Sequence, residues 1–283
     1  MYKIVAKEKL CPAVDFMKIE APKVAKKAKA GQFVVVRVDK VGERIPLTLA
    51  DWDDKEGTVT LVAMQVGTTT YKLAALNTGD HILDLIGPLG LPSEIENFGT
   101  VVCVGGGVGV APVYPVARAL KQAGNKVITI MGARSKDLLF WEERLRSVSH
   151  ELIVTTDDGS YARKGVVTEP LKEVLEKDKQ ISRVIAIGPA IMMKFCSLTT
   201  KPFGVTTIVS LNSIMVDGTG MCGCCRVSVG GITKFVCVDG PEFDGHQVDW
   251  ELVFARQRIY CDEEKRSLEL WKAHQCQHSK IGE

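Results

Sequence analysis

Four residues near the carboxyl end of the chain follow the spacing Asp217-x4-Cys222-x2-Cys225-x11-Cys237. With a cysteine in place of Asp217, this would be the plant-type 2Fe–2S pattern, in which three ligands crowd one loop and the fourth comes from a later strand. Residues 217–225 include four glycines or threonines, and glycine tolerates the positive φ values that turn backbone N–H groups toward sulfur. The spacing therefore predicts a 2Fe–2S cluster at Cys222, Cys225 and Cys237, with Asp217 as the fourth ligand or, alternatively, as a loop residue where a water or Cys224 completes the site.

A zinc site is the alternative for this loop, because Cys-x2-Cys also binds zinc. A nucleotide-binding regulatory protein with a structural zinc at Cys222 and Cys225 would fit the same residues, although zinc sites usually pair two such motifs and only one is present. Cys224 lies between two predicted ligands, either as an inert thiol or as an alternative ligand. The nine cysteines are otherwise scattered, which is typical of a reducing compartment, so we expect a cytoplasmic protein.

A glycine-rich turn, Gly105-Gly106-Gly107-Val108-Gly109, follows an apolar strand directly and opens a helix. Glycines in that setting let the backbone approach a phosphate at the positively polarised amino terminus of the helix. The alternative is an ordinary tight turn between strand and helix. The position after a strand favours a nucleotide site that includes Gly106, Gly107 and Gly109.

Three other predicted strands end in unusual residues, at 132–135, 156–160 and 188–190. Open parallel sheets bind ligands beyond the carboxyl ends of their strands, so we expect these loops to converge on one crevice. Taken singly, each loop is equally consistent with a helix cap.

Two segments in the first hundred residues carry candidate anion-binding groups, residues 44–48 (Arg-Ile-Pro-Leu-Thr) and 66–70 (Val-Gly-Thr-Thr-Thr). An arginine on an otherwise apolar strand requires an anionic partner. A glycine followed by three threonines at the start of a helix offers hydroxyl and N–H groups to a diphosphate. A surface arginine and a threonine-rich helix cap are the alternative.

The elements that position these residues change type near residue 100. The first part predicts a small antiparallel barrel, with strands at 2–9, 16–20, 33–38, 46–50, 59–64 and 81–86 and one helix at 71–76. The second part alternates strands and helices, which indicates a doubly wound parallel sheet. Its strands are expected at 101–104, 126–131, 152–156, 184–187 and 207–211, and its helices at 113–123, 138–148, 170–178 and 190–199. A polar helix is expected at 250–277.

The whole chain has 283 residues, 46% hydrophobic and 25% charged, with a net charge of +2. These values are typical of a globular protein of two domains plus an appendage and give no reason to expect nucleic acid. We expect no signal peptide and no membrane span, because no apolar run is long enough.

The order of these motifs resembles that of the ferredoxin reductase-like flavoproteins: Arg-x-Pro-Leu-Thr at 44–48, Gly-Pro-Leu-Gly at 87–90, the glycine turn and then a cluster loop. Within that superfamily the chain is similar to electron-transfer subunits of dihydroorotate dehydrogenase. It is more similar to small subunits of electron-bifurcating NADH-dependent ferredoxin:NADP oxidoreductases, also called sulfide dehydrogenase small subunits. The dihydroorotate relatives use four cysteines, whereas an aspartate at the position of Asp217 marks the bifurcating subunit.

The resemblance, which covers residues 1–275, implies a β + α/β fold: an FAD-binding antiparallel β-barrel at 1–97, an NAD(H)-binding doubly wound domain at 98–211, a 2Fe–2S segment at 212–245 and a helical tail at 246–283 that could contact a partner. It implies three sets of site residues. FAD would contact Arg44, Pro46, Leu47, Thr48, Val62, Gln65, Gly67, Thr69 and Thr70. NAD(H) would contact Gly106, Gly107, Gly109, Arg134, Asp157, Asp158, Gly159 and Gly188. The cluster ligands would be Asp217, Cys222, Cys225 and Cys237.

The function implied is an electron-transfer subunit in flavin-based electron bifurcation, in which electrons pass from NADH through FAD and the cluster to a partner. That partner would be a larger subunit of a heterodimer, carrying a second flavin, further clusters and the NADP and ferredoxin reactions. A dihydroorotate dehydrogenase-type subunit is the alternative. The five histidines form no recognisable acid–base constellation, which fits chemistry performed by a cofactor.

Overall fold

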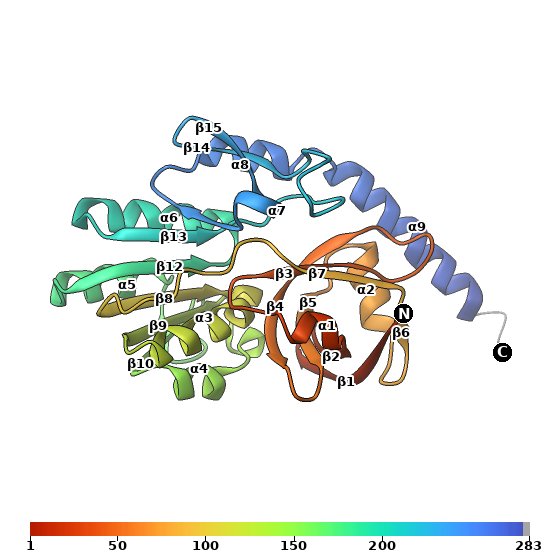
Figure 1. The fold of residues 1–283 in the computed structure, drawn as a ribbon, viewed down its shortest axis with the longest axis horizontal. Coiled ribbons are helices and arrows are strands. Elements are labelled where there is room, and N and C mark those ends of the chain that lie inside the picture. The colour runs from red at the N-terminus through yellow and green to blue at the C-terminus, as the bar shows by residue number, and fades with distance from the viewer. Residues whose placement is uncertain (280–283) are drawn as a thin grey trace.

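The computed structural model describes residues 1–279, which form two seven-stranded sheets, a two-stranded hairpin and the helices that cover them (Figure 1). The last four residues of the predicted tail, 280–283, lie outside the described residues. Among the residues described, no helix combines the length and the apolar character that a membrane span requires.

The first sheet is a nearly closed antiparallel barrel with the strand order β6-β1-β2-β5-β4-β3-β7. Its strands are β1 (Tyr2–Cys11), β2 (Val14–Glu20), β3 (Phe33–Arg37), β4 (Ile45–Asp53), β5 (Thr58–Met64), β6 (His81–Ile82) and β7 (Asp84–Leu89). Two helices accompany it, α1 (Pro22–Ala25) and α2 (Thr68–Ala75). Apolar side chains such as Ile4, Met17 and Leu61 fill the interior and are fully buried. The predicted barrel is confirmed.

The second sheet is parallel except at one edge and has the order β11-β10-β9-β8-β12-β13-β16. Its strands are β8 (Thr100–Gly106), β9 (Lys126–Ala133), β10 (Glu151–Thr156), β11 (Arg163–Lys164), β12 (Ile181–Ile187), β13 (Thr206–Ser210) and β16 (Glu242–Asp244). The chain runs outward from β8 to β9 and β10, then returns to the other side of β8 for β12 and β13. The carboxyl end of β8 is therefore the point where the strand order reverses.

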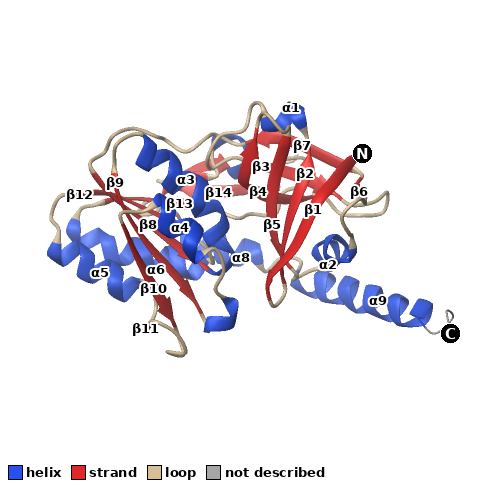
Figure 2. Ribbon diagram, turned by 90° about the horizontal axis from the view of Figure 1, so that it is seen from below, coloured by secondary structure: helices blue, strands red, loops and turns tan. Residues whose placement is uncertain are grey.

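Helices cover both faces of this sheet, as Figure 2 shows. They are α3 (Val110–Gln122), α4 (Glu142–Val148), α5 (Thr168–Lys177) and α6 (Ala190–Thr200), with short 3-10 turns η1 (Gly107–Gly109), η2 (Lys136–Leu138) and η3 (Lys201–Phe203). One core contains Val113 of α3 and Leu145 of α4, and another contains Leu171 of α5 and Met193 of α6. The doubly wound fold is confirmed.

Residues 212–249, called the cluster segment below, connect the edge of the parallel sheet to the tail. They contain the hairpin β14 (Arg226–Val229) and β15 (Ile232–Phe235), the short helix α7 (Val236–Asp239) and β16. Because β16 pairs antiparallel with β13, the segment is anchored to the second sheet by main-chain hydrogen bonds. Two helices follow, α8 (Trp250–Gln257) and α9 (Cys261–Ser279).

Two helix predictions were wrong. The helix expected at 138–148 begins only at Glu142, because Trp141 adopts a left-handed φ of 60°. That conformation places the Trp141 ring edge-on against Phe16, Tyr114 and Phe140, with centroids 5.8–6.4 Å apart. The single helix expected at 250–277 is broken at 258–260. Its two parts pack in different places: α8 buries Trp250 and Val253 in the core of the second sheet, whereas α9 lies along α2.

Candidate functional site

The glycine turn after β8 contains glycines of two kinds. A Cβ at Gly109 would lie 2.2 Å from the carbonyl oxygen of Ile187, and one at Gly106 would lie 2.3 Å from Sδ of Met192. Gly109 thus allows η1 to lie against the end of β12, and Gly106 allows the end of β8 to lie against Met192 of α6. Gly107 has a φ of +54° and a Cβ there would meet nothing within 4 Å. The backbone of Gly107 therefore faces open space where α3 begins, which is the setting that suits a phosphate.

The other predicted NAD(H) residues lie at the ends of neighbouring strands. Arg134 follows β9 and is exposed, and Asp157 and Asp158 follow β10. The two loops are bonded to each other, since the N–H of Asp157 donates to the carbonyl of Ala133 (3.0 Å) and that of Asp158 to the carbonyl of Arg134 (3.1 Å).

The carboxylate of Asp158 already has partners within its own loop. It accepts from the hydroxyl and N–H of Ser160 at 2.7 and 2.9 Å, and the hydroxyl bond in particular lowers the pKa of Asp158. Gly159, with a φ of +76°, completes this turn, and Gly188 follows β12 beside Gly106. The structure thus brings all three predicted loops to the edge of the sheet beside Gly107.

The predicted flavin residues lie on two adjoining parts of the barrel. Pro46, Leu47 and Thr48 are half-buried on β4, where they pair with β3, and Val62 is buried on β5. Arg44 was expected on the strand, but it precedes β4 by one residue and is exposed.

The start of α2 is shaped by a threonine hydroxyl. The hydroxyl of Thr70 accepts the N–H groups of Val66 and Gly67 at 2.9 and 3.0 Å and donates to the carbonyl of Gly67. The hydroxyl of Thr69 reaches Glu43, next to Arg44, at 3.4 Å. The side chain of Gln65 donates to Asp15 at 2.6 Å. The two predicted halves of the flavin site are therefore neighbours.

Helix α9 was not expected at this place. The hydroxyl groups of Thr68 and Ser267 are 2.9 Å apart, and the rings of Tyr71 and Trp271 have centroids 5.7 Å apart. Helix α9 thus packs on α2, the helix that carries the predicted flavin residues Thr69 and Thr70. The only sequence signal for this contact is Trp271, an aromatic residue in an otherwise polar helix. That signal does not indicate which surface α9 packs on.

The cluster loop, residues 217–225, lies directly on the barrel. Its three glycines, Gly218, Gly220 and Gly223, have φ values of +76°, +85° and +67°. A Cβ at Gly218 would lie 2.8 Å from Cδ1 of Leu89 and 2.9 Å from Cγ2 of Val35. Val35 is on β3 and pairs with Pro46 of β4. The loop is thus one strand away from the predicted flavin residues.

The four predicted ligands form two pairs. The sulfurs of Cys225 and Cys237 are 3.3 Å apart, buried and free of a disulfide. The carboxylate of Asp217 accepts the N–H of Thr219 (2.8 Å) and the N–H of Cys222 (2.9 Å), so Asp217 and Cys222 are neighbours. In the part of the chain that the structure describes, no three potential ligands converge on one point.

Burial determines the charge of the sulfur pair. Burial raises the pKa of Cys237 to about 12, so the thiol stays protonated by itself. A thiol that binds a metal is deprotonated, because the cation offsets the cost of burying the thiolate. Two thiolates with bonds of about 2.3 Å to one tetrahedral metal lie about 3.7 Å apart. The Cys225–Cys237 separation is close to that value, so this pair fits one metal atom.

Backbone N–H groups stabilise the ionised forms of the other pair, Asp217 and Cys222. The N–H of Thr219 holds the pKa of Asp217 below its usual range, and the N–H of Cys224 lowers the pKa of the Cys222 thiol. Both groups therefore favour the ionised forms that bind metal. Two pairs of donors suit a cluster of two iron atoms, and the ligand role of Asp217 remains a prediction.

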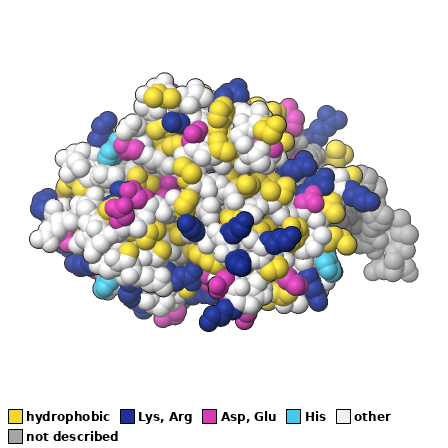
Figure 3. All heavy atoms as spheres, in the orientation of Figure 1, with side chains coloured by type: hydrophobic (Ala, Val, Ile, Leu, Met, Phe, Trp, Pro, Cys, Tyr) yellow, Lys and Arg dark blue, Asp and Glu magenta, His cyan; other side chains and the backbone are white. Residues whose placement is uncertain are grey.

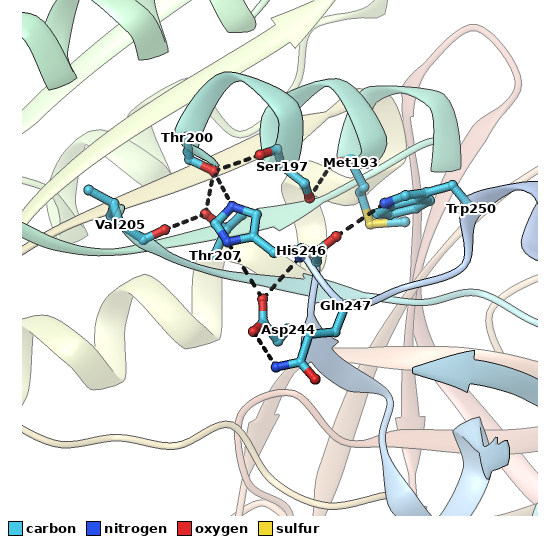
Figure 4. Close-up of polar contacts among 10 residues, drawn as sticks. Met193, Ser197, Thr200, Val205, Thr207, Asp244, His246, Gln247 and Trp250 are labelled. Atoms are coloured by element: carbon cyan, nitrogen blue, oxygen red, sulfur yellow. Dashed lines mark hydrogen bonds and ion pairs between the residues drawn. The ribbon is translucent and has the colours of Figure 1, made fainter. Parts of the chain in front are cut away.

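A buried polar group joins the cluster segment to the second sheet (Figure 4). Nε2 of His246 is 2.9 Å from the hydroxyl of Thr200, which accepts from the hydroxyl of Thr207 at 2.5 Å. Nδ1 of His246 is 3.9 Å from Asp244, too far for a hydrogen bond. Thr200 and Thr207 are fully buried. This Asp–His–Thr series is consequently a structural link and not a nucleophile with its base.

Comparisons with known proteins agree with this organisation. Residues 212–249 match the iron–sulfur cluster binding domain of dihydroorotate dehydrogenase B, and residues 103–197 match the oxidoreductase NAD-binding domain. A ferredoxin NADP+ reductase from Neisseria gonorrhoeae shares the fold, with a TM-score of 0.60 over 72% of this chain and 90% of that chain at 20% identity. The barrel, the parallel sheet and the cluster segment define a ferredoxin reductase-like oxidoreductase with an iron–sulfur domain.

Closer relatives identify the family. A dihydroorotate dehydrogenase B (NAD(+)) electron transfer subunit homolog of Thermotoga maritima is 52% identical over 94% of both chains. The corresponding electron transfer subunit of Streptococcus pneumoniae is 33% identical over 85% of this chain and 94% of its own length. This chain belongs to the family of dihydroorotate dehydrogenase B electron transfer subunits and their homologues. The family expected from the motifs is confirmed.

One solved structure is particularly similar. It belongs to an NADH-dependent reduced ferredoxin-NADP oxidoreductase studied for flavin-based electron bifurcation, and it has a TM-score of 0.91 and 50% identity over 96% of this chain and 98% of that chain. The match of the cluster segment to an iron–sulfur domain favours the iron–sulfur centre over the zinc alternative.

Proposed function

We propose that this chain is the FAD- and 2Fe–2S-containing electron-transfer subunit of an electron-bifurcating NADH-dependent ferredoxin:NADP oxidoreductase. The observation that carries the proposal is the contact of Gly218 with Val35, because Val35 lies on the strand that pairs with β4, and β4 carries predicted flavin residues. Electron transfer from NADH through the flavin to the cluster requires the cluster to lie close to the flavin. The 50% identity with the oxidoreductase structure supports the same assignment.

The residues of the chain would serve to bind and orient. Gly107 leaves room for a phosphate at the start of α3, and Arg134 and Asp157 would contact the nucleotide at the same sheet edge. Arg44 and the start of α2 would hold the flavin by charge and N–H groups. When bound, FAD accepts a hydride and releases electrons singly, and a 2Fe–2S cluster carries one electron at a time.

Asp217, Cys222, Cys225 and Cys237 would hold the cluster. The domain limits of 1–97, 98–211, 212–245 and 246–283 are part of the same proposal, as is the cytoplasmic location. The described cysteines are all free, which agrees with a reducing compartment.

A larger partner subunit would carry the NADP and ferredoxin reactions in a heterodimer. Three hydrophobic side chains beside the predicted ligands are exposed, Val216 (46%), Met221 (89%) and Val238 (40%). Figure 3 shows hydrophobic side chains on the face that the cluster segment and the barrel share. An exposed apolar area next to an electron-transfer centre suits a protein interface.

The experiment is to purify the chain with its partner, without oxygen, from cells that express it naturally. We expect NADP+ reduction that requires NADH and reduced ferredoxin together. A complex that instead reduces NAD+ with dihydroorotate would establish the pyrimidine alternative, which the family name supports. Protein without flavin, iron and labile sulfide would contradict both functions.

A further inference from the structure

Two arginines bind main-chain carbonyl groups inside the cluster loop. Nη1 of Arg226 donates to the carbonyl of Gly223 at 3.1 Å, and Nη2 of Arg256 donates to the carbonyl of Cys224 at 2.8 Å. Both carbonyls lie between the predicted ligands Cys222 and Cys225. Neither arginine forms an ion pair with any carboxylate of the described residues, so each brings an unneutralised positive charge to the loop.

The two arginines differ in how they are held. Arg226 is exposed and begins β14, directly after the loop. Arg256 is half-buried and comes from α8, which is fixed in place independently of the loop. The side chain of Asp249 caps α8 by accepting the N–H of Leu252 (3.0 Å), and Val253 of α8 is 4% exposed. Arg256 is thus presented to the loop by a packed helix.

The helix also holds the entry to the loop. The side-chain amide of Gln257 donates to the carbonyl of Asn212 at 3.1 Å, at the first residue of the cluster segment. Consecutive side chains of α8 therefore fix the backbone before the loop and within it. Only Arg256 adds a charge to this contact.

The carbonyl contacts fix the direction of two N–H groups. In a trans peptide the C=O and the following N–H lie in one plane and point in opposite directions. When Arg256 binds the carbonyl of Cys224, the N–H of Cys225 is turned away from the guanidinium. Arg226 does the same for the N–H of Cys224. N–H groups beside cluster ligands and nearby positive charge are both features that set the reduction potential of an iron–sulfur centre.

We propose that Arg256 is a positioning residue of the iron–sulfur centre, which holds the Cys224–Cys225 peptide in place and raises the reduction potential of the cluster through its charge. The inference rests on the proposed function, since it presupposes a cluster in this loop. A positive charge favours the reduced cluster, which carries one more negative charge than the oxidised one. The half-buried position of Arg256 leaves that charge less screened than the charge of exposed Arg226.

The test compares Arg256→Gln with two matched controls in the anaerobically purified protein. Arg256→Lys keeps the charge but loses the fork geometry. Arg258→Gln removes the same charge two residues away, from an exposed side chain without a contact to the loop. Iron and labile sulfide are determined first, and an EPR-monitored redox titration then measures the cluster potential.

We expect Arg256→Gln to lower the ratio of reduced to oxidised cluster at fixed ambient potential about tenfold, which is a shift of about 59 mV for a one-electron couple. Arg256→Lys should restore most of that shift, and Arg258→Gln should show none. An unchanged potential in Arg256→Gln, or an equal shift in Arg258→Gln, would overturn the inference.

If Arg256→Gln fails to retain iron, the rate of cluster loss to a chelator decides instead. Arg256→Lys should then lose its cluster faster than Arg258→Gln, because its ammonium cannot reproduce the guanidinium geometry. Equal rates would overturn the inference. A wild-type protein without iron and sulfide would contradict the proposed function itself, a result distinct from all of these.

Discussion

The glycine turn at 105–109 and the cluster loop at 217–225 both follow strands of the same sheet, but they are held in different ways. In the turn, Gly109 is fixed by the backbone of Ile187, deep between two buried strands. In the loop, Asp217 and Arg256 bind backbone groups from the side. Close packing against a neighbouring backbone therefore shapes the glycine turn, whereas the cluster loop combines the packing of Gly218 on the barrel with polar contacts to its backbone.

The largest effect should follow from removing a buried thiol of the loop. Without Cys237, its neighbour Cys225 has no second donor at 3.3 Å for a shared metal atom. We expect Cys237→Ala to contain no cluster iron and no labile sulfide, while flavin content and NADH binding remain. Cys261→Ser, on α9, is the control that should retain iron. Normal iron in Cys237→Ala would remove that residue from the ligand set.

The next effect concerns the packed side of the turn. A Cβ at Gly109 would lie 2.2 Å from a backbone oxygen that cannot move alone, so the chain must deform. Overpacking of this kind costs about 3 kcal/mol. We expect Gly109→Asn to lower the free energy of unfolding by about that amount in urea denaturation, with poor recovery of soluble protein. Wild-type stability would show that η1 and the end of β12 are not tightly packed.

The same substitution at Gly107 should separate ligand binding from stability. Asparagine tolerates the φ of +54°, and a Cβ there meets no atom within 4 Å. We expect near-normal stability and FAD content for Gly107→Asn. Its affinity for NADH, measured by isothermal titration, should fall about tenfold, or about 1.4 kcal/mol, because the new side chain enters the phosphate space. Unaltered NADH affinity would show that the nucleotide does not bind at this turn.

The smallest effect tests the link between the cluster segment and the parallel sheet. His246 bonds to Thr200 at 2.9 Å, and a typical hydrogen bond of this kind contributes about 1 kcal/mol. His246→Ala should therefore lower stability by about 1 kcal/mol without loss of iron. Loss of the cluster in this variant would mean that the link also shapes the loop at 217–225.

The parts of the molecule that were predictable are those governed by local pattern. Strand alternation indicated the barrel, strand–helix alternation indicated the parallel sheet, and the glycines of the turn lie at the strand end where they were expected. The left-handed Trp141 was not predictable, because three distant aromatic rings determine its conformation. The contact of Arg256 with Cys224 joins residues 32 positions apart, so no local sequence pattern predicts it. The long-range polar contacts around the cluster loop could consequently not be predicted from the sequence.

The central claim is that this chain takes electrons from NADH and delivers them one at a time to its iron–sulfur centre. The most direct test is an anaerobic titration of the purified chain with NADH, followed by visible absorption and EPR together. The account predicts that the flavin absorption bleaches and that an EPR signal of a reduced 2Fe–2S cluster appears in the wild-type chain but not in Cys237→Ala. Flavin that NADH does not reduce, or a wild-type chain with zinc in place of iron and sulfide, would contradict it.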